Sequence, residues 1–206
     1  MKAAALRGFF CFQPRPKRRG KRRKIVKKTL VFGLAVMLGM IFCRSAAAHF
    51  GMVIPSDSMV MMEDHRAVRL QVSFSHPFEG IGMDMERPKQ FGVAANGKRQ
   101  DLLGALEKTQ IMDHAAWRAD HRIKRPGAYL FYLEPEPYWE PAEDVYIIHL
   151  TKTVVAAFGD DEGWDTELGL KTEIVPLSKP FGLYAGNVFQ GIVKMDGKPV
   201  PYAEVE

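Results

Sequence analysis

The sequence predicts an all-β protein: an antiparallel, immunoglobulin-like β-sandwich that follows a signal peptide, with the start of a second small β unit at the C-terminus. Three observations indicate this fold class. After residue 48 apolar residues recur with a period of two, turn signals follow at intervals of about 8–15 residues, and the segments between them are short and rich in β-branched and aromatic residues. Short strands at that spacing are typical of antiparallel sandwiches rather than of sheets covered by helices.

The first 48 residues have the composition of an export signal. They hold 13 Lys and Arg and no acidic residue, and the apolar run at 29–43 is followed by three alanines at 46–48. A charged region, an apolar region and a small-residue cleavage site, in that order, define a secretory signal peptide. We therefore expect cleavage after Ala48 and a periplasmic location, with an uncleaved membrane anchor as the alternative.

The charge of the chain is divided unevenly. The whole sequence has a formal net charge of +5, but residues 49–206 hold 16 basic and 24 acidic residues, a net charge of −8. Because the part expected to fold is acidic, we expect no nucleic-acid partner. Both cysteines, Cys11 and Cys43, precede residue 49, which excludes a disulfide scaffold, a thiolate metal site and a cysteine nucleophile from the exported chain.

Several segments after residue 48 read as strands. Apolar and polar residues alternate over 68–74, which predicts a half-buried strand. Asn96-Gly97 separates the apolar run 91–95 from residues 98–102 and predicts a hairpin, since these two residues accept the positive φ angles of a tight turn.

Further along, β-branched and aromatic residues predict strands over 127–134 and 145–155. Residues 102–117 are the only fair helix candidate, on a weak periodicity.

These patterns predict three segments: the signal peptide at 1–48, a β-sandwich metal-binding domain at 49–180, and the start of a second sandwich-like unit at 186–206. The last segment contains an apolar run, an Asp196-Gly197 turn and a further extended run. Two strands cannot bury a core, so we expect this unit to be truncated here or to complete the first sandwich.

Four residues are candidate metal ligands. Cleavage after Ala48 would make His49 the N-terminus, where amine and imidazole nitrogens together chelate Ni²⁺, Co²⁺ or Cu²⁺. His76 and Glu79 follow the best strand and could supply a nitrogen and an oxygen at the sandwich rim. His149, within an apolar strand, is a fourth candidate, although a lone strand histidine is more often a packing residue.

Methionines suggest an alternative metal. Six of them fall between residues 52 and 85, and Met59-x-Met61 and Met83-x-Met85 have the pair spacing of copper-handling proteins, since thioethers suit Cu⁺. The competing interpretation is packing, because methionine also fills cores.

An acidic belt covers residues 134–167, with ten Asp and Glu and a single basic residue, Lys152. It would concentrate cations or a basic partner, or serve only as a solvated face. The chain carries no phosphate-binding loop and no G-x-S-x-G or H-E-x-x-H motif, so we expect no enzyme.

Several motifs occur in a fixed order: HPFEG at 76–80, MDM at 83–85, PYWEPAED at 137–144, HLTK at 149–152, EIVPL at 173–177, PFGLYAGNVF at 180–189 and DGKPV at 196–200. Together they resemble a known family, the periplasmic component of nickel/cobalt uptake systems of the energy-coupling-factor type, also catalogued as a domain of unknown function. The resemblance implies a β-rich periplasmic protein that serves a transporter of Ni²⁺ or Co²⁺ and passes the ion to an inner-membrane permease. It implies no ligand set, so the metal residues rest on their own chemistry. The alternatives are a copper-handling protein, a copper enzyme built on a terminal histidine, and an adhesion module without a metal.

The signal peptide yields the first prediction. N-terminal sequencing of the exported protein should read His-Phe-Gly-Met, because the small residues before His49 suit the signal peptidase. A sequence that starts at Met1, or a lipid-blocked Cys43, would contradict cleavage at this junction.

Overall fold

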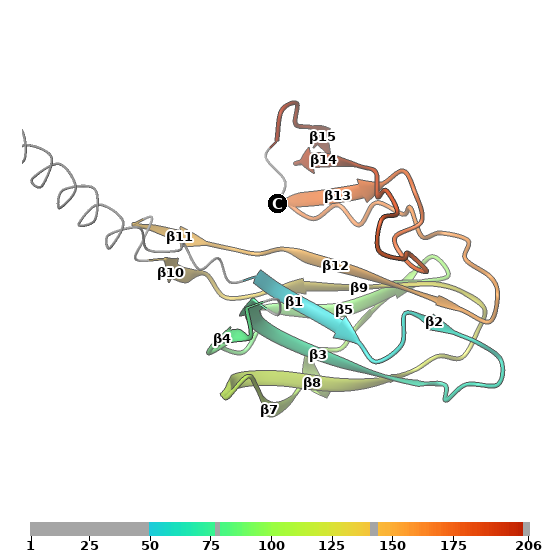
Figure 1. Ribbon diagram of the computed structural model, residues 1–206, viewed down its shortest axis with the longest axis horizontal. Coiled ribbons are helices and arrows are strands. Elements are labelled where there is room, and N and C mark those ends of the chain that lie inside the picture. Colours follow the sequence, from blue (N-terminus) through green and yellow to red (C-terminus); the bar gives the residue numbers. More distant parts are fainter. Residues whose placement is uncertain (1–49, 77–78, 141–143, 204–206) are drawn as a thin grey trace, which may run out of the picture. The chain divides into compact units, whose positions relative to one another are not determined.

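Two β-sheets packed face to face form the body of the protein in a computed structural model of the chain (Figure 1). The structure describes residues 50–76, 79–140 and 144–203; the predicted signal peptide and His49 lie outside these ranges. Strands dominate the described residues, the one helical element among them is the 3₁₀ turn η1 (Leu103–Ala105), and the all-β prediction is confirmed. No helix in this described part is long and apolar enough to cross a membrane.

The first sheet has the order β1–β3–β8–β7, with β4 paired to the end of β3. Its strands are β1 (Phe50–Pro55), β3 (Ala67–His76), β4 (Ile81–Met83), β7 (Glu107–Ile111) and β8 (His114–Arg122). The second sheet has the order β2–β12–β9–β5–β6. Its strands are β2 (Met59–Val60), β5 (Gln90–Ala95), β6 (Lys98–Asp101), β9 (Gly127–Glu134) and β12 (Thr151–Ala157).

The start of the described chain contributes a strand to each sheet. β1 pairs antiparallel with β3 in the first sheet, whereas β2 pairs parallel with β12 in the second. The other ladders of both sheets are antiparallel. This strand order is the immunoglobulin arrangement, in which the first strand is divided between the two sheets.

The core lies between the two sheets. The alternating residues predicted in β3 are all buried there, and they meet large side chains from the facing sheet. The principal members are Val68, Leu70, Val72, Phe74, Phe91, Trp117, Tyr129, Phe131, Leu133 and Val155.

The second sheet is buried on both faces. In β12, Val155 and Ala157 face the sandwich core, while Val154 and Ala156 face a second cluster that contains Leu168 and Phe181. A strand buried on both faces carries a continuous apolar run, which explains the VVAA sequence of β12.

A tyrosine fixes the corner between β8 and β9. The hydroxyl of Tyr129 donates to the Arg125 carbonyl at 3.0 Å and accepts from the backbone amides of Arg125 at 3.1 Å and Lys124 at 3.3 Å. A tyrosine near the start of a strand, here β9, that is bonded to the chain just upstream is the tyrosine corner of immunoglobulin-like folds.

The weak helix prediction for residues 102–117 is wrong. Apart from η1, this stretch forms β7 and the first half of β8, joined at Met112 and Asp113, which both have positive φ angles. Ala116 and Ala119 of β8 are buried in the sheet, so tertiary packing overrides their helical preference. The Asn96-Gly97 hairpin is confirmed between β5 and β6.

A third sheet follows the sandwich. β13 (Thr172–Pro176), β14 (Gly191–Met195) and β15 (Lys198–Pro199) pair antiparallel, so β13 belongs with the C-terminal hairpin although it falls within the range 49–180 expected for the sandwich. A two-stranded ribbon, β10 (Tyr138–Glu140) and β11 (Val145–Ile147), extends from the end of β9.

A buried ion pair links this third sheet to the sandwich. Lys152 Nζ of β12 lies 2.5 Å from Glu173 Oε1 of β13, and the two side chains are 8% and 2% exposed. Glu173 also accepts from the amides of Leu168, Gly169 and Leu170. Burial by itself raises the pKa of Glu173, but these amides and Lys152 outweigh it and hold the pKa below its ordinary value.

The tyrosine corner yields a prediction. Tyr129→Phe should lower the free energy of unfolding by about 1–2 kcal/mol, because it removes the hydroxyl's bonds and leaves the Arg125 carbonyl unsatisfied. Urea denaturation of residues 49–206 measures this change. Tyr146→Phe is the matched control, since the Tyr146 side chain is 71% exposed and should change stability little.

Candidate functional site

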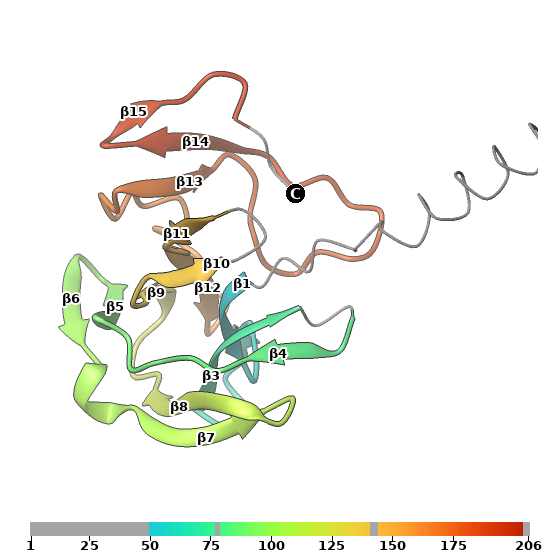
Figure 2. The ribbon, with the colours of Figure 1, turned by 90° about the vertical axis from the view of Figure 1, so that its left-hand side faces the viewer.

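A cluster of aromatic and histidine rings lies where β1 begins. Figure 2 shows the ribbon there, with β1 beside β3 and β12. The Phe50 ring centroid lies 5.6 Å from that of His76 and 6.0 Å from that of His149. Tyr138 lies 5.6 Å from His149 and 5.1 Å from Phe74. Two of the predicted ligands, His76 and His149, therefore contact the same phenylalanine.

His76 and Glu79 are joined by a backbone hydrogen bond. His76 ends β3, and its carbonyl accepts the Glu79 amide at 3.1 Å. The His76 ring is half-buried and Glu79 is exposed. The bond links the main chain of these two predicted ligands, and their shared use of one ion stays a prediction.

His149 has a different partner. Its Nδ1 accepts the Gly51 backbone amide at 2.9 Å, so in the neutral ring the proton is on Nε2. Burial lowers the pKa of His149 below its ordinary value, which favours this neutral form. To bind a metal, His149 would have to give up this hydrogen bond or change its tautomer.

The bond from Gly51 is one of three that join β1 to β12 or to His149 just before it. Thr151 Oγ1 donates to the Gly51 carbonyl at 2.5 Å, and Thr153 Oγ1 donates to the Val53 carbonyl at 2.9 Å. Alternate side chains of residues 149–153 thereby form hydrogen bonds with backbone groups on the edge of β1 that does not pair with β3. We call these three contacts the seam.

Glycine is required at position 51. A Cβ there would lie 2.9 Å from His149 Cβ and 3.1 Å from the His149 carbonyl oxygen. Sequence reasoning did not identify the seam. Its only signal was the alternation of His, Thr and Thr over 149–153, which pattern analysis assigns simply to one face of a strand.

The structure tests the metal prediction only for the described residues. Within residues 50–76, 79–140 and 144–203, no group of three or more His, Cys, Asp or Glu side chains is placed to hold a metal ion. His49 lies outside the described residues. The predicted ligands His49, His76, Glu79 and His149 therefore stay predictions.

The methionines divide into two groups. Met85 is buried in the core and Met83 packs against it, so packing accounts for this pair. Met59 is 42% exposed, and its sulfur lies next to Gly182. Met61 and Met62 are exposed by 44% and 61%, and core packing does not account for them.

Lysines from other segments neutralise part of the acidic belt. Lys152 of the belt itself is buried against Glu173. Ion pairs to the belt's carboxylates are formed by Lys89 with Glu136, Lys179 with Asp161 and Lys194 with Glu167. The belt therefore attracts cations less strongly than its composition suggests.

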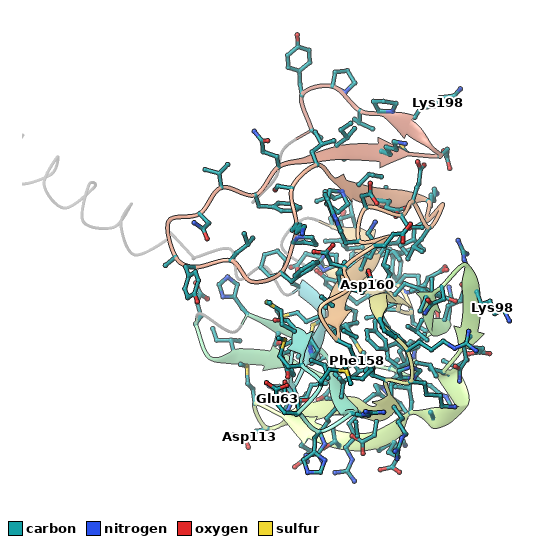
Figure 3. The ribbon with its side chains drawn as sticks, turned by 90° about the vertical axis from the view of Figure 1, so that its right-hand side faces the viewer. Glu63, Lys98, Asp113, Phe158, Asp160 and Lys198 are labelled. Atoms are coloured by element: carbon teal, nitrogen blue, oxygen red, sulfur yellow. The ribbon has the colours of Figure 1, made fainter. Side chains whose placement is uncertain are left out.

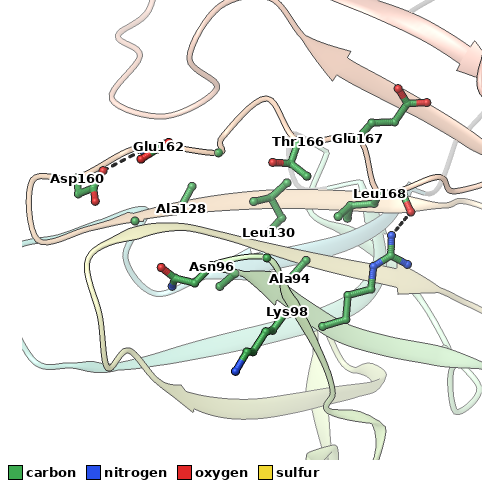
Figure 4. A pocket seen from close by; sticks show the side chains of 15 residues that line it. Ala94, Asn96, Lys98, Ala128, Leu130, Asp160, Glu162, Thr166, Glu167 and Leu168 are labelled. Carbon is green, nitrogen blue, oxygen red and sulfur yellow. Dashed lines mark hydrogen bonds between the residues drawn. The ribbon is translucent and has the colours of Figure 1, made fainter.

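Two hollows lie near these elements. One of about 520 Å³, on the outer face of the second sheet, has Ala94, Ala128 and Leu130 among its lining, and Arg99 spans to the Leu168 carbonyl beside it (Figure 4). The other, of about 700 Å³, lies between β1, β12 and the third sheet and includes Phe50 and His149. The second hollow adjoins the ring cluster, whereas none of the predicted ligands lines the first.

Comparison with known proteins gives one match. The family model of a domain of unknown function (DUF4198) matches residues 46–206. No curated protein and no solved structure matches the chain.

The seam predicts a pH-dependent stability. Because the pKa of His149 is lowered in the folded chain, the unfolded chain takes up the proton first as the pH falls. The stabilisation is complete above the ordinary imidazole pKa of about 6.5 and is lost as the pH falls toward the lower folded value. The free energy of unfolding in urea should therefore decrease from about pH 7.5 to about pH 5.

Two variants isolate the contribution of His149. His149→Asn keeps a carbonyl acceptor that does not titrate. As the pH falls, its free energy of unfolding should therefore decrease less than that of the parent. His121, whose pKa is lowered by burial and by Lys124, contributes equally to both proteins. Thr151→Val, the control, should cost about 1 kcal/mol at both pH values, because a hydroxyl does not titrate. Equal pH dependence of the parent and His149→Asn would contradict the role of His149.

Proposed function

The chain belongs to the DUF4198 family, and we propose that it is a periplasmic protein that captures Ni²⁺ or Co²⁺ at the β1 end of the sandwich and delivers the ion to a membrane permease. The periplasmic location rests on the export-signal pattern of residues 1–48. The permease partner and the identity of the metal rest on the resemblance to nickel/cobalt uptake systems. The binding site rests on the chemistry of the β1 end.

The register of β1 and β3 is the observation that carries the proposal. Phe50 is paired with Ser75, and the next residues along the two strands in this direction are His49 and His76. Directly opposed residues of an antiparallel ladder share one face of the sheet. We infer that continuation of the ladder by one pair brings the two imidazoles together.

The resulting donors suit a divalent ion of intermediate softness. After cleavage, His49 would offer its α-amine and its imidazole, His76 a second imidazole, and Glu79, whose amide bonds to the His76 carbonyl, a carboxylate. Three nitrogens and one oxygen suit Ni²⁺, Co²⁺ and Cu²⁺ better than Mg²⁺ or Ca²⁺.

The role of His149 in this proposal is to hold β1. It binds the amide of Gly51, two residues after His49, and so restrains the strand from which the terminal ligands extend. The predicted fourth ligand thus contributes through the seam when its Nδ1 keeps the hydrogen bond to Gly51.

A site of this kind also suits delivery. A thiolate site would hold the ion tightly, whereas imidazole and amine ligands release it when protons compete. Residues 49–206 contain no cysteine, in agreement with reversible capture. We expect no catalytic activity, because the sequence carries no enzyme motif.

Metal titration tests the proposal. Calorimetry of exported protein that starts at His49 should show binding of one Ni²⁺ or Co²⁺ at neutral pH and weaker binding near pH 5, since protons compete for imidazole and amine. His76→Ala, or one alanine added before His49, should each weaken binding about tenfold or more, because each removes a nitrogen donor or displaces the terminal amine. Glu79→Gln should have a smaller effect, since an amide oxygen is a weaker donor.

Two controls accompany this titration. His114→Ala removes an imidazole that is bonded to Asp84 and should leave Ni²⁺ affinity unchanged. Cu²⁺ should bind more tightly than Ni²⁺ to the same ligands, as the usual order of divalent affinities requires. Unchanged Ni²⁺ and Co²⁺ affinity in the double variant His49→Ala/His76→Ala would refute the site.

A further inference from the structure

We propose a second metal site, for monovalent copper, in the loop that follows β2, with Met61, Met62 and His65 as its ligands. These residues fall within five consecutive positions, MMEDH, at 61–65. The inference is independent of the divalent-ion site, because none of the three residues belongs to the ring cluster at the start of β1.

The exposure of these methionines is the first argument. Met61 and Met62 are 44% and 61% exposed, although methionine is an apolar residue that folded chains tend to bury. Two adjacent exposed methionines at a loop cost hydration energy and contribute nothing to the core. A role in binding a soft ion accounts for their presence.

The anchoring of β2 determines their direction. Val60 is buried, its carbonyl accepts the Phe158 amide at 2.8 Å, and β2 pairs with the end of β12. Side chains alternate across a strand, so the residue after the inward-facing Val60 is directed to solvent. The backbone bonds of β2 therefore hold Met61 in an outward position.

Asp64 closes the loop on Met61. Its carboxylate accepts the Met61 amide at 2.7 Å, and its own amide donates to the Met61 carbonyl at 3.2 Å. The second bond defines a β-turn, with Met62 at its first corner and His65 just beyond it. Met61 and Met62 belong to this turn, His65 follows it directly, and all three proposed ligands are exposed on this small loop.

Met59 is excluded from the ligand set. Its sulfur packs against Gly182, where a Cβ would lie 2.9 Å from it. The sulfur of Met59 therefore already fills a packing position next to the loop at residue 182.

The charges around the loop favour a cation. Glu63, labelled in Figure 3, and Asp64 lie within it, and Asp57 precedes it. The Arg66 guanidinium, just after the loop, stacks over the Phe158 ring at 5.1 Å. Residues 57–65 carry these three carboxylates and no Lys or Arg, and the carboxylates attract a metal ion.

The donor set selects Cu⁺. Two thioethers and one imidazole form a soft, three-coordinate site, whereas Ni²⁺ and Co²⁺ favour sets richer in nitrogen and oxygen. Cu⁺ is bound and released without change of oxidation state, so no redox partner is needed. The structure also separates the two sites: β1 starts at the ring cluster, and β2 and its loop lie at the far end of β3, before Ala67.

Competition with a colorimetric Cu⁺ chelator under anaerobic conditions tests the proposal on the exported protein. The parent should remove one Cu⁺ from the chelator, and Met61→Leu/Met62→Leu should weaken this binding about tenfold or more, because leucine keeps the apolar bulk but has no sulfur. His65→Gln should weaken it as well. Oxidation of the methionines to sulfoxides should have the effect of the double leucine variant.

Met195→Leu is the matched control, since Met195 is 48% exposed on β14 and stands alone. It should leave Cu⁺ affinity unchanged, and Met61→Leu/Met62→Leu should leave Ni²⁺ affinity unchanged. Cu⁺ affinity equal to that of the parent in the double leucine variant would overturn the site and favour an apolar docking role, which leucine would preserve. A loss of Cu⁺ binding in His49→Ala/His76→Ala, with no loss in the double leucine variant, would overturn it equally.

Discussion

Along one edge of the sandwich, side chains instead of a strand ladder hold β1 against β12. β1 uses one main-chain edge to pair with β3, and its other edge would leave polar groups unsatisfied next to the core. His149, Thr151 and Thr153 satisfy those groups at Gly51 and Val53. The two sheets are thereby closed at this edge, and the start of β1 is held in place.

The other face of β12 depends on a second kind of contact. Lys152 points away from the seam and reaches Glu173, whose carboxylate is held by three consecutive backbone amides and by this lysine. Removing one partner of a buried ion pair leaves an uncompensated charge, which is strongly destabilising. Because side chains alternate along β12, Thr151 and Thr153 bond to β1 on one side and Lys152 bonds to the third sheet on the other.

The two proposed metal sites lie at opposite ends of β3. One is at the end of β3 around His76, whose ring packs against Phe50. The other is in the turn after Val60, where sulfur donors are exposed. Their donor sets differ in softness, so the same chain could distinguish Ni²⁺ or Co²⁺ from Cu⁺ without competition between the sites.

The sequence by itself determined the strands whose patterning is local. The alternation of 68–74 and the Asn96-Gly97 turn led directly to β3 and the β5–β6 hairpin, because burial of one face and positive φ angles are read from adjacent residues. Tertiary structure alone decided the pairing of β13 with β14, the strand character of 107–122, the seam, and which methionines are buried. Each of these depends on contacts between residues far apart in the chain, such as His149 with Gly51, and neither periodicity nor spacing carries that information.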